Sequence, residues 1–432
     1  MTTATVRLWG TTIGYASMGH DETFARFEYD PAFVDMGIDL APLMMPAEIG
    51  KIYRFPELHP RSFHGLPGLL SDSLPDKYGN RLIDVWLAQT GRSATEFNAV
   101  DRLCYVGVRG MGALEFEPPS DRHERDSKDL QVQDLVELAS IAFASKKSLD
   151  VKLGETGSDQ GLLDILSVGA SAGGARAKAV IAYNEKTKTL RSGQLDLTPG
   201  YEHWLIKFDG VKYSGDWGIA DPAGYGLLEY SYHQMAKECD IDMMECRLLS
   251  ENGRHHFMTR RFDRNDDGEK YFVQTLAALN HFDYFETGAY SYEQIIMMMR
   301  QLKMPMDMIE QQVRRTIFNL VGCNQDDHVK NFGFMMDRQG MWSLTPAYDL
   351  CHSEGSEFTK THQLSLNGKL KQFTMTDLKH LEEYAGLPRN FHKRVLEKTL
   401  DAFTGWERVA KDLEIPTQLR KHVLNTLRMN WG

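Results

Sequence analysis

The sequence has no apolar run long enough to span a membrane, and residues 1–7 lack the basic and apolar regions of a signal peptide. Its five cysteines are odd in number and lack the spacing of a metal site, which predicts buried thiols in a reducing compartment. Tandem repeats and low-complexity segments are also missing. These absences predict a cytoplasmic globular protein that does not enter a membrane.

Positive charge is scarce as well. The 49 lysines and arginines are outnumbered by 60 aspartates and glutamates, and the net charge of −11 argues against broad nucleic-acid binding by the whole chain. One basic run late in the chain is more typical of a solvated helix face; it comprises Lys369, Lys371, Lys379, Arg389, Lys393, Arg394 and Lys398. The length of 432 residues allows two lobes or two to three subdomains.

The most informative stretch is a polar loop at residues 324–331, which reads Asn-Gln-Asp-Asp-His-Val-Lys-Asn. Apolar residues at helical spacing over 307–322 precede it, and two short β-type runs follow at 332–336 and 341–344, joined by turn residues. A second loop then ends in Asp349. The predicted order is therefore a buried helix, a polar loop, a hairpin and an acidic loop.

This order is typical of the way a kinase-like fold assembles phosphoryl transfer. Asp326 and Asn331 have the spacing in which an aspartate accepts the hydroxyl proton and an asparagine five positions later binds Mg²⁺. Asp349, beyond the hairpin, has the place of the aspartate that holds the metal against the phosphates. The alternative interpretation is a polar loop with Asx turns and a surface ion pair.

Residues upstream fall in the matching order. A small-residue loop at 171–178 runs into a strand, and such loops let backbone N–H groups approach phosphate oxygens. Lys207 ends an apolar strand at 204–208, as the phosphate-contacting lysine of a kinase does, and a buried ammonium needs a partner. Glu229, on the predicted helix that follows, is the candidate partner. The simpler alternatives are a flexible turn and a solvated glutamate.

The remaining sequence gives a coarser outline. Residues 5–29 predict an antiparallel meander, and residues 74–87 predict a helix. The glycine-containing run at 106–114 predicts a tight loop, not a phosphate loop, because no helix follows it. Residues 117–129 are polar and without periodicity, which predicts a linker, and the chain is mostly helical from about residue 291.

At this point the chain resembles a known family, the HipA-type Ser/Thr protein kinases, which are the toxins of bacterial HipA–HipB toxin–antitoxin modules. Positions 324–331 meet the whole family signature N-x-D-x-H-x-K-N. Further matches are Pro346 with Tyr348 and Asp349, the Arg-Phe-Asp-Arg run at 261–264, and the segments at 8–14 and 70–76. The resemblance covers nearly the whole chain, although the loop at 173–178 departs from the family pattern.

The resemblance implies an α+β, bilobal protein-kinase-like fold, related to phosphatidylinositol-kinase-type folds. Its N-terminal part should be β-rich and its C-terminal lobe all-α. The expected division is a HipA-type N-terminal subdomain at 1–128, a nucleotide-binding mixed lobe at 129–265 and a mainly helical catalytic lobe at 266–432.

The resemblance also implies a role for each matching residue. Asp326 would be the catalytic base, Asn331 and Asp349 would hold Mg²⁺, and Lys207, paired with Glu229, would contact the phosphates of ATP. Ser171 falls where the family autophosphorylates its loop. The other expected nucleotide contacts are Ala172, Gly173, Gly174, Ala175, Arg260, Phe262 and His328.

The implied function is an ATP- and Mg²⁺-dependent protein serine/threonine kinase. It would phosphorylate itself and a translation-related protein such as glutamyl-tRNA synthetase, which causes growth arrest and persistence. The implied partners are a HipB-type helix-turn-helix antitoxin dimer and, mainly through it, operator DNA, so that the toxin joins in autorepression. Two alternatives stay open: a kinase for a small molecule or lipid, and a non-catalytic corepressor that binds an antitoxin and DNA. The complete set of Lys207, Asp326, Asn331 and Asp349 argues against the corepressor, since a pseudokinase usually lacks one of them.

Overall fold

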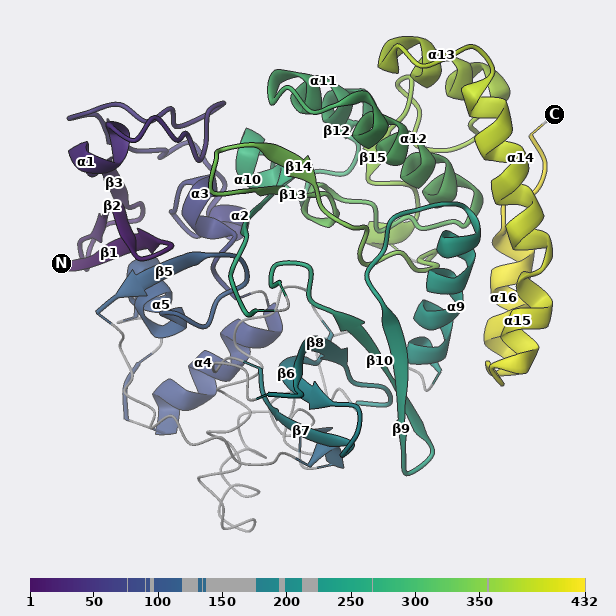
Figure 1. The fold of residues 1–432 in the computed structure, drawn as a ribbon, viewed down its shortest axis with the longest axis horizontal. Coiled ribbons are helices and arrows are strands. Elements are labelled where there is room, and N and C mark those ends of the chain that lie inside the picture. Colours follow the sequence, from purple (N-terminus) through teal and green to yellow (C-terminus); the bar gives the residue numbers. More distant parts are fainter. Residues whose placement is uncertain are drawn as a thin grey trace. The chain divides into compact units, whose positions relative to one another are not determined.

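The computed structural model describes most of the chain (Figure 1). The chain divides into two compact units, each made of two separate stretches of sequence. Unit 1 comprises Met1–Gly226 and Arg247–Val273, and unit 2 comprises Leu227–Cys246 and Gln274–Gly432. The predicted three-part division, at residues 128 and 265, stays a prediction. The described residues are 1–75, 77–89, 91–93, 97–118, 131–133, 135–136, 176–193, 199–211, 224–265, 267–355 and 357–431.

Unit 1 begins with a five-stranded antiparallel sheet of order β4-β3-β2-β1-β5. Ala4, Val6 and Leu8 are buried at alternate positions, which is the period of a strand with one face on a core. The predicted meander over residues 5–29 is therefore confirmed. The strands are β1 (Thr2–Leu8), β2 (Thr11–Met18), β3 (Arg26–Tyr29), β4 (Ile52–Tyr53) and β5 (Leu114–Glu117).

Short helices follow the first strands. The helix predicted at 74–87 begins later, at Lys77, because the turn that ends the preceding helix runs on to Leu74, whose N–H donates to the Ser71 carbonyl (3.0 Å). Asn98 and Asp101 form a capping box at the start of α5. The helices are α1 (Pro31–Val34), α2 (Pro60–Phe63), α3 (Gly68–Ser71), α4 (Lys77–Gln89) and α5 (Ala99–Val106).

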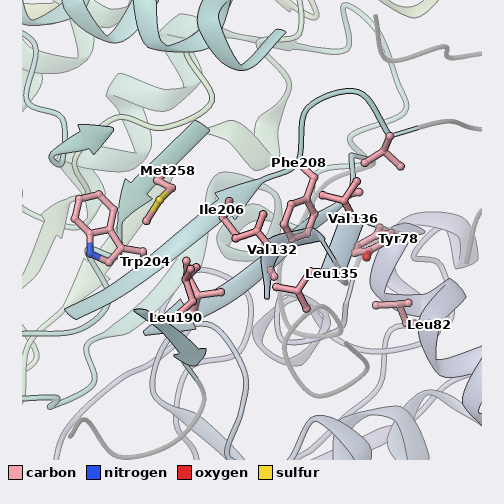
Figure 2. Close-up of a cluster of buried hydrophobic side chains, with 14 of the residues drawn as sticks. Tyr78, Leu82, Val132, Leu135, Val136, Leu190, Trp204, Ile206, Phe208 and Met258 are labelled. Carbon is pink, nitrogen blue, oxygen red and sulfur yellow. The ribbon is translucent and has the colours of Figure 1, made fainter. Parts of the chain in front are cut away.

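A second sheet of unit 1, of order β7-β6-β8-β10-β9, carries the predicted phosphate-contacting lysine. Figure 2 shows Trp204, Ile206 and Met258 on its core side, in one buried cluster with Tyr78 and Leu82 of α4. Ile206 faces the core, and successive side chains of a strand point to opposite faces of its sheet. Lys207, the next residue of β8, therefore lies on the face opposite the core. The strands are β6 (Lys178–Asn184), β7 (Thr189–Ser192), β8 (Glu202–Lys207), β9 (Cys246–Glu251) and β10 (Arg254–Arg260).

Unit 2 is mainly helical, and its central helix is the one predicted before the polar loop. Ile309, Val313, Ile317 and Leu320 of α12 are buried at helical spacing, which confirms that prediction. The helices are α9 (Tyr225–Glu238), α10 (Leu276–Asn280), α11 (Tyr292–Gln301), α12 (Met306–Val321), α13 (Met375–Ala385), α14 (Phe391–Thr404), α15 (Trp406–Asp412) and α16 (Thr417–Thr426).

The strands of unit 2 are short. The predicted hairpin is present, with β13 and β14 paired antiparallel, and β12 pairs with β15 in parallel. These strands are β11 (Phe272–Thr275), which crosses from unit 1, β12 (Tyr290–Ser291), β13 (Gly333–Met336), β14 (Trp342–Leu344) and β15 (Leu364–Ser365); the 3₁₀ helices are η2 (Val329–Asn331) and η3 (Glu357–Thr359).

All five cysteines are free, as predicted, although one of them, Cys351, is only half-buried. Burial raises the pKa of the Cys239 thiol to about 12, so this group stays protonated at neutral pH. No helix in the part of the chain that the structure describes is long and apolar enough to cross a membrane.

A buried histidine in unit 2 predicts a loss of stability in mild acid. Burial, together with the neighbouring His422, lowers the pKa of His352 from 6.5 to about 4. Between these values the unfolded chain binds a proton that the folded chain does not, so the free energy of unfolding falls as the pH drops from about 6.5 to 4.

The free energy of unfolding of the natural sequence falls between pH 7 and pH 5. We expect that of His352→Gln to fall by about 2 kcal/mol less over the same range. Urea unfolding of both proteins at the two pH values measures this difference. Equal acid sensitivity of the two proteins would show that His352 does not stay neutral in the folded state.

Candidate active site

The polar loop at 324–331 is closed by a hydrogen bond between Asp326 and Asn331, the two residues with the predicted spacing. Asn331, in η2, donates a hydrogen bond from Nδ2 to the backbone carbonyl of Asp326 (2.7 Å). This bond uses the amide nitrogen of Asn331 and leaves its Oδ1 as the atom that can bind a cation. The loop thus brings together the candidate base and one candidate metal ligand.

The two adjacent aspartates of the loop have opposite environments. The Asp326 side chain is 43% exposed, whereas that of Asp327 is fully buried. Asp327 accepts hydrogen bonds from the Tyr292 hydroxyl (2.5 Å), His362 Nδ1 (2.7 Å) and the Gln363 backbone N–H (2.7 Å). Only Asp326 can therefore meet a substrate. The anchoring role of Asp327 was not predicted, because its partners come from residues 35 and 36 positions away.

Asp349 lies in a loop that is joined to the polar loop through Asn324. Asn324 Nδ2 donates to the Asp349 carbonyl (3.5 Å), and the Tyr348 hydroxyl donates to the Lys330 carbonyl (2.8 Å). Asp349 has a φ of 51°, a left-handed conformation that is uncommon for residues with a side chain, although aspartate adopts it more readily than most. The structure therefore brings Asp326, Asn331 and Asp349 into one pair of connected loops.

These residues fit a magnesium ion that keeps several of its waters better than they fit a cation whose ligands all come from the protein. Asp349 supplies a carboxylate and Asn331 an amide oxygen, the hard ligands that Mg²⁺ prefers. No group of three or more His, Cys, Asp or Glu side chains that could hold a metal occurs among the described residues. A cation with few protein ligands that keeps several waters matches this donor set.

His328 lies beside the candidate base. Its Nδ1 accepts the Lys330 N–H (3.3 Å), so Nε2 is the ring nitrogen that carries a proton, and it lies 3.8 Å from Asp326 Oδ1. The ring of Tyr284 lies near both His328 and Lys330. Its centroid is 5.7 Å from that of the His328 ring and 4.6 Å from Lys330 Nζ. Aromatic and cationic groups therefore flank Asp326 on this side.

In unit 1, Lys207 is the last residue of β8 and lies opposite Lys178 of β6 in the antiparallel ladder. Directly paired residues share a face of the sheet, and both lysines are buried, with 7% and 3% of their surface exposed. Phe257 of β10 shares this face, with its ring centroid 5.7 Å from Lys207 Nζ. Two ammonium groups thus gather on one face, which suits an anionic ligand.

Arg260, the last residue of β10, lines a polar cavity of about 200 Å³ and lies 3.6 Å from Glu202. His203 in the same cavity is buried, and its Nδ1 has no hydrogen-bond partner. Burial and the nearby guanidinium groups lower its pKa to about 4, so the ring is neutral at pH 7. A buried atom without a partner is costly unless a ligand satisfies it. The cavity is lined by Tyr201, Glu202, His203, Arg260, Arg261, Arg264 and Asn265.

The Arg-Phe-Asp-Arg run is a buried ion cluster. Arg261 contacts both carboxylate oxygens of Asp263 (2.8 and 2.6 Å), and Arg264 Nη1 lies 2.7 Å from the same group. The Gly112 N–H also donates to Asp263 (2.7 Å), and Arg264 donates to the Gly110 and Gly112 carbonyls. The run at 106–114 is thus a loop, as predicted, and the backbone of this loop binds the ion cluster, which the sequence did not indicate.

Comparison with models of known protein families shows which family the chain belongs to. A family model described as the HipA-like C-terminal domain matches residues 170–406, more than half of the chain. The chain belongs to the HipA family. A second model, the HipA N-terminal domain, matches residues 4–117. The family predicted from the loop signature is therefore confirmed. A search of curated proteins gave no match.

Solved structures show the fold. HipA of Shewanella oneidensis MR-1, solved with HipB and operator DNA of its toxin–antitoxin system, has a TM-score of 0.67 and 16% identity, and the match covers 98% of this chain and 95% of that one. The predicted fold class is confirmed as a HipA-like fold. The expected all-α C-terminal lobe was wrong in detail, because this lobe also contains the short strands β12 to β15. The Helicobacter pylori proinflammatory kinase CtkA gives a TM-score of 0.40 and 12% identity, covering 59% of this chain and 87% of that one.

Several predicted HipA-type site residues stay predictions. Ser171 and the four small residues at 172–175 lie outside the described residues. Phe262 directly follows the Arg260–Arg261 pair at the cavity. Glu229 is buried in α9 and belongs to unit 2, whereas Lys207 belongs to unit 1, so their pairing is untested.

Proposed function

We propose that this HipA family member is a Mg²⁺-dependent protein kinase that transfers the γ-phosphoryl group of ATP to a serine or threonine hydroxyl. The observation that carries the proposal is the exposed Asp326 in a loop closed by Asn331, beside the Asp349 loop. One exposed carboxylate and two further hard oxygen donors are the set that phosphoryl transfer requires of a protein.

Bound Mg²⁺–ATP supplies the phosphoryl group and a counter-charge for its oxygens. Asp326 takes the proton of the substrate hydroxyl as the hydroxyl oxygen bonds to the γ-phosphorus and the bond to the ADP oxygen breaks. Asn331 and Asp349 would hold the cation, and Lys207 would contact the phosphates. Lys178 and Lys207 are buried and lie opposite each other on one face of the second sheet, which supports an anionic ligand on that face.

The base of the nucleotide is proposed to lie at Arg260 and Phe262. The partnerless Nδ1 of the neutral His203 in the adjoining cavity supports a polar ligand with a hydrogen-bond donor at this end. His328, beside Asp326, is proposed as a further nucleotide contact.

We also propose that the protein is the toxin of a toxin–antitoxin module in the cytoplasm. The structural similarity to a HipA that was solved with HipB and operator DNA supports this proposal. A HipB-type antitoxin dimer would be the partner, and DNA would be reached mainly through it, in autorepression. A translation protein such as glutamyl-tRNA synthetase is the proposed target, with growth arrest and persistence as the result.

Labelled phosphate transfer separates the proposal from its alternatives. The purified protein is incubated with γ-labelled ATP, Mg²⁺ and, in separate reactions, a Ser/Thr peptide library, phosphoinositide vesicles and a set of small-molecule alcohols. We expect label on peptides and on the protein itself. Label on lipid or small molecules alone would replace the protein kinase with a kinase of another class. No transfer at all, with antitoxin binding intact, would favour the corepressor.

The metal site predicts how ATP binding depends on Mg²⁺. Asp349→Asn removes the carboxylate from a site with few protein ligands, so Mg²⁺ should strengthen ATP binding less in this variant than in the natural sequence. We expect the Mg²⁺ enhancement to shrink by about tenfold, equivalent to about 1.4 kcal/mol. Calorimetric titration of ATP with and without Mg²⁺ measures this. An unchanged enhancement would make Asp349 a structural loop residue.

A further inference from the structure

A chain of buried polar side chains in unit 2 links the two loops that carry Asp326 and Asp349. None of its members has more than 3% of its surface exposed, so none can touch a substrate directly. We call it the loop-anchoring network; it comprises Tyr292 of α11, Asn319 of α12, Asn324 and Asp327 of the polar loop, and His362 and Gln363, which precede β15.

The first half of the network ties the start of the polar loop to two helices. Asn324 donates twice to Asn319, from its backbone N–H to the carbonyl and from Nδ2 to Oδ1, both at 3.0 Å. Asn319 Nδ2 in turn donates to the Tyr292 hydroxyl oxygen (3.3 Å). That hydroxyl then donates to Asp327, so each group in this half has a fixed direction of donation.

The second half converges on the Asp327 carboxylate. His362 Nδ1–H and the Gln363 N–H donate to its two oxygens, each at 2.7 Å. Gln363 Nε2 also donates to the Gln325 carbonyl (3.2 Å). The residues on both sides of Asp326 are therefore held by the same pair, His362 and Gln363, while the Asp326 side chain itself stays exposed.

Asn324 extends the network to the second loop. Its Nδ2 lies 3.0 Å from Asn319 Oδ1 and 3.5 Å from the carbonyl of Asp349. One amide nitrogen has two hydrogens, so it can serve both acceptors. The backbone of the candidate metal ligand is thereby tied to the same network as the candidate base.

We propose that Tyr292, Asn324, Asp327 and His362 are positioning residues that set the Asp326 loop and the Asp349 loop against each other. The inference rests on the proposed kinase function for its catalytic consequence. A base and a metal ligand must be held within a fraction of an ångström, and outer partners of such groups typically contribute about 10–100-fold to activity. A fully satisfied buried network has the stiffness for this task.

The test compares a donor-deleting variant with a donor-keeping variant at one position. His362→Leu removes the Nδ1–H donor, whereas His362→Asn presents an amide N–H near the same place. We expect His362→Leu and Tyr292→Phe to lower kcat about 10–100-fold with little change in KM for ATP, and His362→Asn to recover most of the loss.

A matched control lies in the same unit. His392 is also buried, and its Nδ1 lies 2.6 Å from the buried Glu382. His392→Leu should cost stability as His362→Leu does, but it should leave kcat unchanged. If the two leucine variants had equal kcat at a temperature where both are folded, or if His362→Asn were as slow as His362→Leu, the positioning role would be refuted.

Backbone hydrogen exchange tests the linkage without reference to activity. In His362→Leu we expect faster exchange both at 324–331 and at 346–350, because one network holds both loops. Faster exchange in the first loop alone would overturn the proposed linkage. If the natural sequence transferred no phosphate to any substrate but both loops loosened together, the proposed function would fail and the positioning network would stand.

Discussion

Asp326→Asn is expected to lower the rate of phosphoryl transfer by about 10²–10⁴-fold, the usual contribution of a positioned general base. The change removes the proton acceptor and its charge but keeps the shape of the side chain. Asn331 binds the backbone carbonyl of Asp326, so the loop closure survives the substitution. Because the side chain is 43% exposed, the free energy of unfolding should change little.

Three measurements separate catalysis from folding in this variant: kcat on a peptide substrate, ATP affinity by calorimetry, and urea unfolding. We expect only kcat to fall. Asp337→Asn is the control, because Asp337 is a carboxylate of the neighbouring hairpin that only orders its own turn. An undiminished kcat in Asp326→Asn would remove Asp326 from the reaction. A simultaneous loss in the control would point to the loop region as a whole.

Asp263→Asn is expected to destabilise the protein by about 3–5 kcal/mol, the usual cost of breaking a buried ion pair from one side. Burial alone would raise the pKa of this carboxyl, but the guanidinium groups of Arg261 and Arg264 hold it well below its usual range. The group is therefore charged throughout the accessible pH range. Its removal leaves two buried guanidinium groups without their counter-charge, and it weakens the acceptor for Gly112 N–H.

Glu117→Gln, in the same unit, is the matched comparison. Glu117 forms an exposed ion pair with Arg7 at 3.1 Å, and such pairs contribute no more than about 1 kcal/mol. Urea unfolding of the two variants should therefore differ by several kcal/mol. Similar small losses in both would mean that the buried cluster is no more important to stability than a surface pair. The Asp263 variant should also lose protection from hydrogen exchange around residues 107–113, which bind the cluster through their backbone.

Local patterns predicted the candidate site where its geometry depends on neighbours in sequence. The helix, loop and hairpin around residues 324–331 each follow a short-range rule, and the spacing of Asp326 and Asn331 predicted a single loop that the structure closes with one hydrogen bond. Asp349 was predicted from its place beyond the hairpin. The structure shows that Asn324 donates a hydrogen bond to its backbone carbonyl.

Contacts between distant residues set the limit of prediction from sequence. Nothing in the run Asp326-Asp327 distinguishes an exposed carboxylate from a buried one, because the difference is made by Tyr292, His362 and Gln363. The glycines at 110 and 112 likewise gain their meaning from partners about 150 positions later. The late start of α4 has a local cause, a turn carried over from the preceding helix.

The division of each unit into two stretches has a consequence for biosynthesis. Gly112 and Asp263 are 151 positions apart, and residues 227–246, which belong to unit 2, are synthesised between them. A ribosome-bound chain that ends near residue 246 has made most of unit 1 but lacks β10 and the ion cluster that its glycine loop binds. It also carries a stretch of unit 2 whose packing partners, such as Gly322 for the Tyr232 hydroxyl, are not yet made. Unit 1 therefore cannot be completed before Val273 has been made, and the stretch of unit 2 at residues 227–246 must wait longer, until the helices that follow residue 274 have emerged.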